Sequence, residues 1–118
     1  MNLIMPTYLC YNKSMRASKN EILLYLETIK KSLSLKGITH VGLFGSYARD
    51  EAGVYSDIDI AIKKEKNYLQ HRSAYEYFEE VSQIKTLIRQ KFHKNSDVFD
   101  LDSNSSMKSM ILKDLIYV

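Results

Sequence analysis

Residues 42–60 decide the fold, and they read Gly-Leu-Phe-Gly-Ser-Tyr-Ala-Arg-Asp-Glu-Ala-Gly-Val-Tyr-Ser-Asp-Ile-Asp-Ile. The last part of this stretch has the pattern of a strand, in which successive side chains point to opposite faces. Asp57 and Asp59 are therefore expected on one face, and Ile58 on the other. Two carboxylates roughly 6–7 Å apart along a strand repel each other unless a cation neutralises them. The pair predicts a site for Mg²⁺, which prefers oxygen ligands.

A Gly-Ser turn lies ten residues before the carboxylate pair, at the end of an apolar strand predicted over Ile38–Phe44. A strand that stops at Gly45 and Ser46 and enters a short helical turn leaves backbone N–H groups free to bind phosphates. Gly45 permits close approach of a phosphate, and Ser46 adds a hydroxyl donor. Arg49, one turn later, can reach the same anion with its planar guanidinium. The turn and the carboxylate pair together predict a nucleoside triphosphate site.

The spacing Gly45-Ser46, ten residues, Asp57-x-Asp59 resembles the signature of the DNA polymerase beta-type nucleotidyltransferases. The longer string Gly-Ser-Tyr-Ala-Arg, followed by Ser-Asp-Ile-Asp-Ile, is similar to the small stand-alone branch, the minimal nucleotidyltransferases (MNT). The resemblance implies an α/β protein with the small polymerase beta-type nucleotidyltransferase fold. Its sheet is expected to be short and mixed, with helices packed on one face.

The family's third carboxylate lies on a strand after a long helix, at an Asp followed by two apolar residues. Asp97 resembles that pattern, with Ser96 in place of the usual apolar residue. Asp100 is the alternative, but it is expected to point to the opposite face of the strand. A local departure is Asp50-Glu51, where the family commonly has Gly followed by an acidic residue.

Apolar periodicity and turn signals predict the other elements. A capping box, Ser18-x-x-Glu21, opens a helix over 20–35, and Gly37 suits the position after it. Residues 1–14 have no clear period and are expected to be an N-terminal extension of a domain over 15–118, or else an added strand or partner-binding arm. Further predictions are a helical turn over 46–51, a loop over Ala52–Tyr55, strands over Ser56–Lys63 and Ser96–Leu101, and helices over Gln70–Phe92 and through Leu115.

Composition is that of one compact domain, with 118 residues of which 45% are hydrophobic. The net charge of +3 comes from scattered Lys and Arg, which indicates an anionic ligand weakly and does not support direct nucleic-acid binding. The single Cys10 excludes an internal disulfide framework. No signal peptide and no membrane-spanning run are expected, so a cytoplasmic protein is the default prediction.

The resemblance implies an Mg-dependent enzyme that transfers AMP from ATP to a hydroxyl and releases pyrophosphate. Three carboxylates would bind two Mg²⁺ ions, and one of them, Asp97, would also take the proton of the acceptor. The Gly-Ser turn and its arginine would hold the β- and γ-phosphates. The predicted catalytic and metal-binding residues are Asp57, Asp59 and Asp97, and the predicted nucleotide-binding residues are Gly45, Ser46 and Arg49.

The resemblance also implies a partner. Minimal nucleotidyltransferases of this size are typically paired with a small helical HEPN ribonuclease toxin, for which they act as antitoxin, and members AMPylate the toxin on tyrosine. Two alternatives stay open: a non-catalytic binding module that neutralises the partner by contact, and a nucleotidyltransferase acting on a small molecule. Three filled acidic positions favour an enzyme, and the lack of room for a second domain counts against a small-molecule substrate.

Overall fold

A four-stranded sheet lies at the centre of the structure, a computed structural model that describes residues 17–118. The extension predicted for residues 1–14 lies outside the described residues. Along the chain the elements are α2 (Lys19–Leu35), β1 (Ile38–Phe44), α3 (Gly45–Ala48), β2 (Ile58–Lys64), α4 (Tyr68–His71), α5 (Ala74–Phe92), β3 (Ser96–Asp100), α6 (Lys108–Asp114) and β4 (Ile116–Tyr117).

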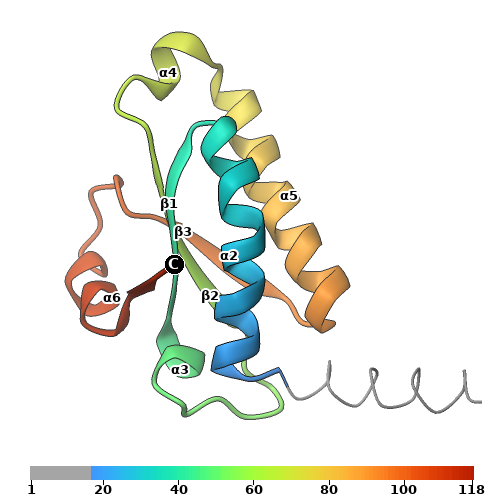
Figure 1. Cartoon of the computed structure of the whole chain (residues 1–118). Coiled ribbons are helices and arrows are strands. Elements are labelled where there is room, and N and C mark those ends of the chain that lie inside the picture. Colours follow the sequence, from blue (N-terminus) through green and yellow to red (C-terminus); the bar gives the residue numbers. More distant parts are fainter. Residues whose placement is uncertain (1–16) are drawn as a thin grey trace, which may run out of the picture.

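The strands lie in the order β3-β2-β1-β4, with β1 antiparallel to β2 and β4, and with β2 parallel to β3. The parallel pair is joined by a crossover that contains α5, as parallel neighbours require. The two long helices α2 and α5 lie on one side of the sheet, and the short α6 lies on the other (Figure 1). This arrangement confirms the predicted small α/β fold with a mixed sheet and its two long helices on one face. The short α6 departs from that prediction, because it packs on the other face.

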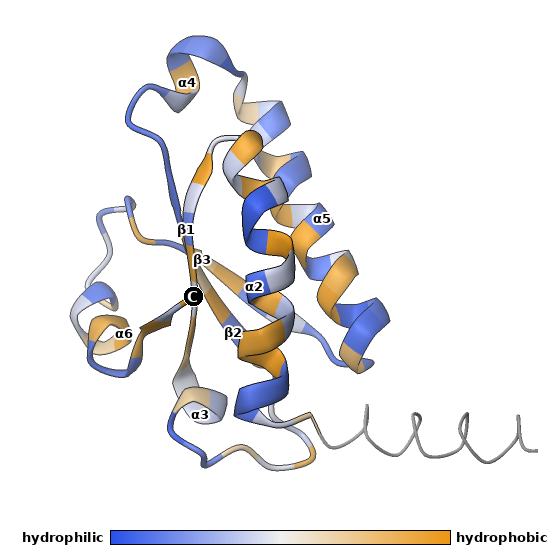
Figure 2. Cartoon of the chain, in the orientation of Figure 1, coloured by the Kyte–Doolittle hydropathy of each residue, from blue (hydrophilic) through white to orange (hydrophobic). Residues whose placement is uncertain are grey.

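The main core lies between the sheet and the two long helices. Ile58, Ile60 and Ile62 of β2 are fully buried there, on the face opposite to Asp59 as the alternation predicted. Apolar positions of the helices turn towards the apolar strands (Figure 2). Each fully buried aliphatic side chain contributes about 1.5–3 kcal/mol, so this face holds most of the stability. A smaller cluster of Ala61, Leu101 and Ile111 joins the other face to α6. Within residues 17–118, no helix combines the length and hydrophobicity needed to cross a membrane.

The capping box predicted at the start of α2 is confirmed. The Glu21 N–H donates to Ser18 Oγ, and the Ser18 N–H donates to Glu21 Oε1, both at 3.2 Å. Gly37 has a φ of +91° after the helix, the conformation for which glycine was expected. The helix predicted over 20–35 therefore forms with the expected ends.

The continuous helix predicted over Gln70–Phe92 is wrong at its start. The chain forms the single turn α4, becomes extended at Arg72, and begins α5 only at Ala74. A second capping box explains the boundary, because the side chains of Ser73 and Glu76 exchange hydrogen bonds with each other's backbone N–H groups.

The strand predicted over Ser56–Lys63 is shifted, because β2 covers Ile58–Lys64. Asp57 is therefore the residue before the strand and not part of it. The strand β4, which pairs with β1, was not predicted. Residues 103–106 offered serine N-caps for the last helix, but the N-cap of α6 is Met107, which makes no side-chain capping bond. The Met107 N–H donates to Ser105 Oγ.

Asp50 stands where the family commonly has glycine, and its backbone conformation explains why this residue is accommodated. Its φ is +60°, the left-handed region in which glycine is least strained and in which Asp is tolerated better than most residues. The Asp50 carboxylate also accepts a hydrogen bond from Lys19 Nζ at 3.0 Å. The turn after α3 thus keeps the glycine-like backbone while using a different residue.

Candidate active site

Asp59 and Asp97 lie side by side on neighbouring strands. The parallel register of β2 and β3 makes their Cα atoms direct partners, so both side chains leave the same face of the sheet. Neighbouring strands are about 4.8 Å apart, which places the two carboxylates within reach of one cation. The structure therefore brings together two of the three acidic residues predicted for the site.

The Asp59 carboxyl lies in a setting that disfavours its charge. Burial raises the pKa of Asp59 above its usual range, and the negative charges of Asp97 and Asp57 raise it further, while Arg49 opposes them weakly. A divalent cation would remove this penalty, because its charge would outweigh the repulsion among the carboxylates. Asp59 thus has the electrostatics of a metal ligand.

Asp57 lies just before β2 and is exposed. Its charge still acts on the site: the pKa of the Tyr47 phenol is raised by burial and then by Asp57. No three His, Cys, Asp or Glu side chains of residues 17–118 are already gathered into a metal-binding group. The oxygen donors of Asp57, Asp59 and Asp97 fit Mg²⁺ in chemistry, and their side chains would turn towards a shared ion on binding.

Gly45 is required by its contact with Asp59. A Cβ on Gly45 would lie 2.1 Å from Asp59 Oδ2, far inside van der Waals contact, and the φ of Gly45 is +77°. Only glycine satisfies both conditions. The sequence suggested glycine here for the approach of a phosphate, whereas the structure adds that the missing side chain makes room for a carboxylate.

Ser46 is half-buried within the short helix α3, and Arg49 is the C-cap of that helix. The Arg49 guanidinium is engaged by two carboxylates: its Nε donates to Glu51 Oε1 at 2.9 Å, and its Nη1 donates to Asp114 Oδ2 at 2.6 Å. These hydrogen bonds, first Glu51 and then Asp114, raise the pKa of Arg49. Arg49 therefore joins α3 to the end of α6, and to bind a phosphate it would exchange one of these partners.

Lys94 supports the site and was not recognised in the sequence. Its Nζ donates to the backbone oxygens of Val54, at 2.8 Å, and Ser56, at 3.0 Å. The loop that carries Asp57 is thereby held against the segment that leads into β3. No local pattern marks Lys94, because its partners lie about forty residues earlier in the chain.

Asp100, the alternative third carboxylate, is used elsewhere. It accepts hydrogen bonds from Lys64 Nζ and the Tyr77 hydroxyl, both at 2.7 Å. Burial alone would raise the pKa of Asp100, but these hydrogen bonds lower it below its usual value. Asp100 joins β3 to α5 and β2 on the core side, away from the face that carries Asp59.

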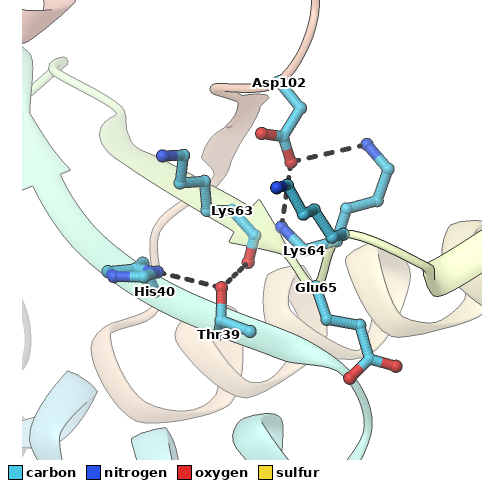
Figure 3. Close-up of a pocket in the computed structure, with 7 residues that line it drawn as sticks. Thr39, His40, Lys63, Lys64, Glu65 and Asp102 are labelled. Carbon is cyan, nitrogen blue, oxygen red and sulfur yellow. Dashed lines mark hydrogen bonds and ion pairs between the residues drawn. The ribbon is translucent and has the colours of Figure 1, made fainter.

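Two lysines, Lys63 and Lys64, lie at the C-terminal end of β2, opposite the end that carries Asp59. A cavity of about 630 Å³ lies there, lined by Lys63, Lys64 and their neighbours. Figure 3 shows these side chains, with Lys64 facing Asp102. Lys63 is four residues from Asp59, about 13 Å along the strand. These lysines therefore do not reach a triphosphate held at the Gly-Ser turn, and they belong to a polar strand end.

Comparison with known proteins agrees with this geometry. The sequence matches the family described as "Polymerase beta, Nucleotidyltransferase" over residues 27–118, and the chain belongs to that family. No curated protein matches the chain.

Two solved structures are similar to the chain. One, provisionally described as a minimal nucleotidyltransferase, has a TM-score of 0.62 at 19% identity and covers 84% of this chain and 94% of its own. The other, provisionally described as a nucleotidyltransferase of Sulfolobus solfataricus, has a TM-score of 0.40 at 18% identity, covering 92% and 85%. The first of these likenesses supports the fold of a small stand-alone nucleotidyltransferase.

Proposed function

We propose that this nucleotidyltransferase transfers AMP from ATP to a tyrosine hydroxyl of a partner HEPN ribonuclease toxin and so acts as its antitoxin. The observation that carries the enzymatic part is the pairing of Asp59 with Asp97 on one face, beside the turn at Gly45. Family membership supports a transferase and a nucleoside triphosphate substrate. The choice of AMP, of tyrosine and of a HEPN partner rests on the resemblance of the motif to minimal nucleotidyltransferases.

The reaction forms one bond and breaks one. The acceptor oxygen attacks the α-phosphorus of ATP, the bond from that phosphorus to the bridging oxygen breaks, and pyrophosphate leaves. Two Mg²⁺ ions held by Asp57, Asp59 and Asp97 would neutralise the triphosphate and the attacking and leaving oxygens. Asp97 accepts the proton of the acceptor hydroxyl. The turn at Gly45 and Ser46 holds the β- and γ-phosphates, so positioning and charge stabilisation supply most of the rate.

Label transfer tests the proposed function. The protein is incubated with Mg²⁺, a lysate of its own host and ATP labelled on the α-phosphate, with ATP labelled on the γ-phosphate in a parallel sample. The expected result is a protein band the size of a HEPN partner that is labelled from the α-phosphate only, and on tyrosine. A labelled small molecule would replace the proposal with the small-molecule reading. Absence of label, together with a stable complex that silences the toxin, would leave neutralisation by contact.

Arg49 and Asp114 allow a separate test of the nucleotide site. Arg49→Ala is expected to weaken binding of a non-hydrolysable ATP analogue about tenfold or more, because an arginine–phosphate pair is charge-assisted. Asp114→Asn removes a competitor for the guanidinium and should keep or increase that affinity, as titration calorimetry with Mg²⁺ would measure. Wild-type affinity in Arg49→Ala would restrict this arginine to holding α6 against α3.

A further inference from the structure

A second, smaller cavity lies between α5 and the start of β3. It has a volume of about 370 Å³, within the range typical of ligand pockets. Four of its residues, at positions 82, 85, 86 and 89, follow the helical spacing that places them on one face of α5. We name it the β3 pocket, and its lining is Ser82, Lys85, Thr86, Arg89, Asn95 and Ser96.

The lining is cationic and carries no carboxylate. Within residues 17–118, neither Lys85 nor Arg89 forms an ion pair, although an Arg89 Nη1 hydrogen donates to Asn95 Oδ1. Ser96 is 8% exposed, and its buried hydroxyl has no hydrogen-bond partner in the described part of the chain. A buried polar group without a partner is unfavourable, and here it stands beside two cations. These features fit an anionic group.

The pocket borders the catalytic strand. Ser96 is the first residue of β3 and directly precedes Asp97, and their side chains leave opposite faces of the strand. Because β3 is at the edge of the sheet, no further strand covers its outer side within the described residues. An extended segment that passes this edge needs only a few residues to reach both the pocket and the hydroxyl-binding side of Asp97.

We propose that the β3 pocket binds an acidic side chain of the acceptor protein, near the hydroxyl that is modified. The inference rests on the proposed function, since it specifies the acceptor of that site as a tyrosine within an acidic segment. Two cations in one small pocket suit a single anionic group, whereas nucleic-acid binding relies on cations that contact many successive phosphates. No aromatic residue lines the pocket on which a nucleobase could stack, so an acidic peptide is favoured over RNA.

Binding tests the pocket independently of catalysis. A fluorescent tyrosine peptide flanked by glutamates and its glutamine counterpart are titrated with the full chain, without ATP, and followed by anisotropy. The glutamate peptide is expected to bind about tenfold more tightly, the effect of one charge-assisted hydrogen bond, and Lys85→Ala/Arg89→Ala should abolish this preference. The control, Lys30→Ala/Lys31→Ala, removes the same charge from exposed positions of α2 and should keep it.

Several outcomes would overturn the inference. These are equal affinity for both peptides in the wild type, a preference that survives in Lys85→Ala/Arg89→Ala, and an equal loss in the α2 control. Tighter binding of a single-stranded RNA of the same charge, lost in the pocket variant, would assign the pocket to nucleic acid instead.

A measurement of AMP transfer to the two peptides distinguishes a failure of this inference from a failure of the proposed function. With Mg²⁺ and α-labelled ATP, the wild type should modify the glutamate peptide with a higher kcat/KM than the glutamine peptide. The pocket variant should lose that difference through KM while its kcat on the glutamine peptide is unchanged. Selective binding of the glutamate peptide without label transfer would uphold the pocket and contradict the proposed reaction.

Discussion

Asp97→Asn is expected to lower AMP transfer by about 100-fold or more while keeping most of the affinity for Mg·ATP. Charge stabilisation and proton removal at the attacking oxygen act in the transition state, and each is typically worth two or more orders of magnitude. Asp57→Asn and Asp59→Asn should instead weaken Mg²⁺-dependent ATP binding and transfer together. Calorimetry with a non-hydrolysable analogue and label transfer with α-labelled ATP measure the two effects.

Asp100→Asn is the matched control on the same strand. It removes the negative charge that pairs with Lys64 and replaces one of the two carboxylate oxygens that accept hydrogen bonds, so it should lower the free energy of unfolding and leave transfer by the folded protein close to wild type. Full transfer in Asp97→Asn, with loss in Asp100→Asn, would show that the third carboxylate is Asp100. If folded Asp97→Asn protected cells from the toxin as well as the wild type does, the proposal that the toxin is neutralised by catalysis would be contradicted.

Asp59→Asn offers a readout without substrate. The pKa of Asp59 is raised from 3.8 by folding, so the ionised carboxylate destabilises the fold at pH values above that raised pKa. In the absence of Mg²⁺, the variant should therefore unfold at a higher Tm than wild type near neutral pH. The advantage should fall as pH falls through the raised pKa, and it should be absent below pH 3.8, where the carboxyl is neutral in both states.

Gly45→Ala is expected to damage both stability and activity. The backbone strain of a positive φ costs about 1–2 kcal/mol for a residue with a Cβ, and the new methyl group would lie 2.1 Å from Asp59 Oδ2. Asp59 or the α3 turn must shift, and a displacement of about 1 Å in a catalytic group can cost about 100-fold in rate. Urea unfolding and label transfer measure the two losses.

Gly53→Ala is the control for this substitution, because a Cβ there meets no atom within 4 Å. Its stability should stay within about 0.5 kcal/mol of wild type. A double-mutant cycle sharpens the test: Asp59→Ala removes the clashing carboxylate, so Gly45→Ala should cost less in that background than in the wild type. Wild-type activity of Gly45→Ala would show that Asp59 does not pack against this turn.

The motif residues and the strand faces could be predicted because they depend on local rules. Alternation in a strand placed Asp59 opposite to the buried isoleucines, and the same rule separated Asp97 from Asp100. The capping box at Ser18 fixed the start of α2 in the same way. A matching box, Ser73-x-x-Glu76, was present in the sequence but was not used, so the predicted helix began too early, at Gln70.

The remaining features depend on contacts between distant segments. β4 is two residues long and exists because it pairs with β1, so no periodicity could reveal it. Asp114 contacts the Arg49 side chain, and Lys94 contacts the backbone oxygen of Val54, each from a distant part of the chain. The spacing of residues in the sequence carries no information about such contacts. The role of Gly45 beside Asp59 likewise follows from tertiary packing, although the glycine itself was recognised.

The α5 crossover has a consequence for the order in which the protein is made. During synthesis Asp57 and Asp59 leave the ribosome well before Asp97, because the whole of α5 is translated between β2 and β3. A nascent chain that ends within α5 contains β1, the Gly-Ser turn and β2, but no strand to pair with the outer edge of β2. Non-local pairing of this kind forms late in folding. Interrupted translation would therefore release fragments that lack Asp97, and transfer activity would begin only in chains that have been translated and folded past β3.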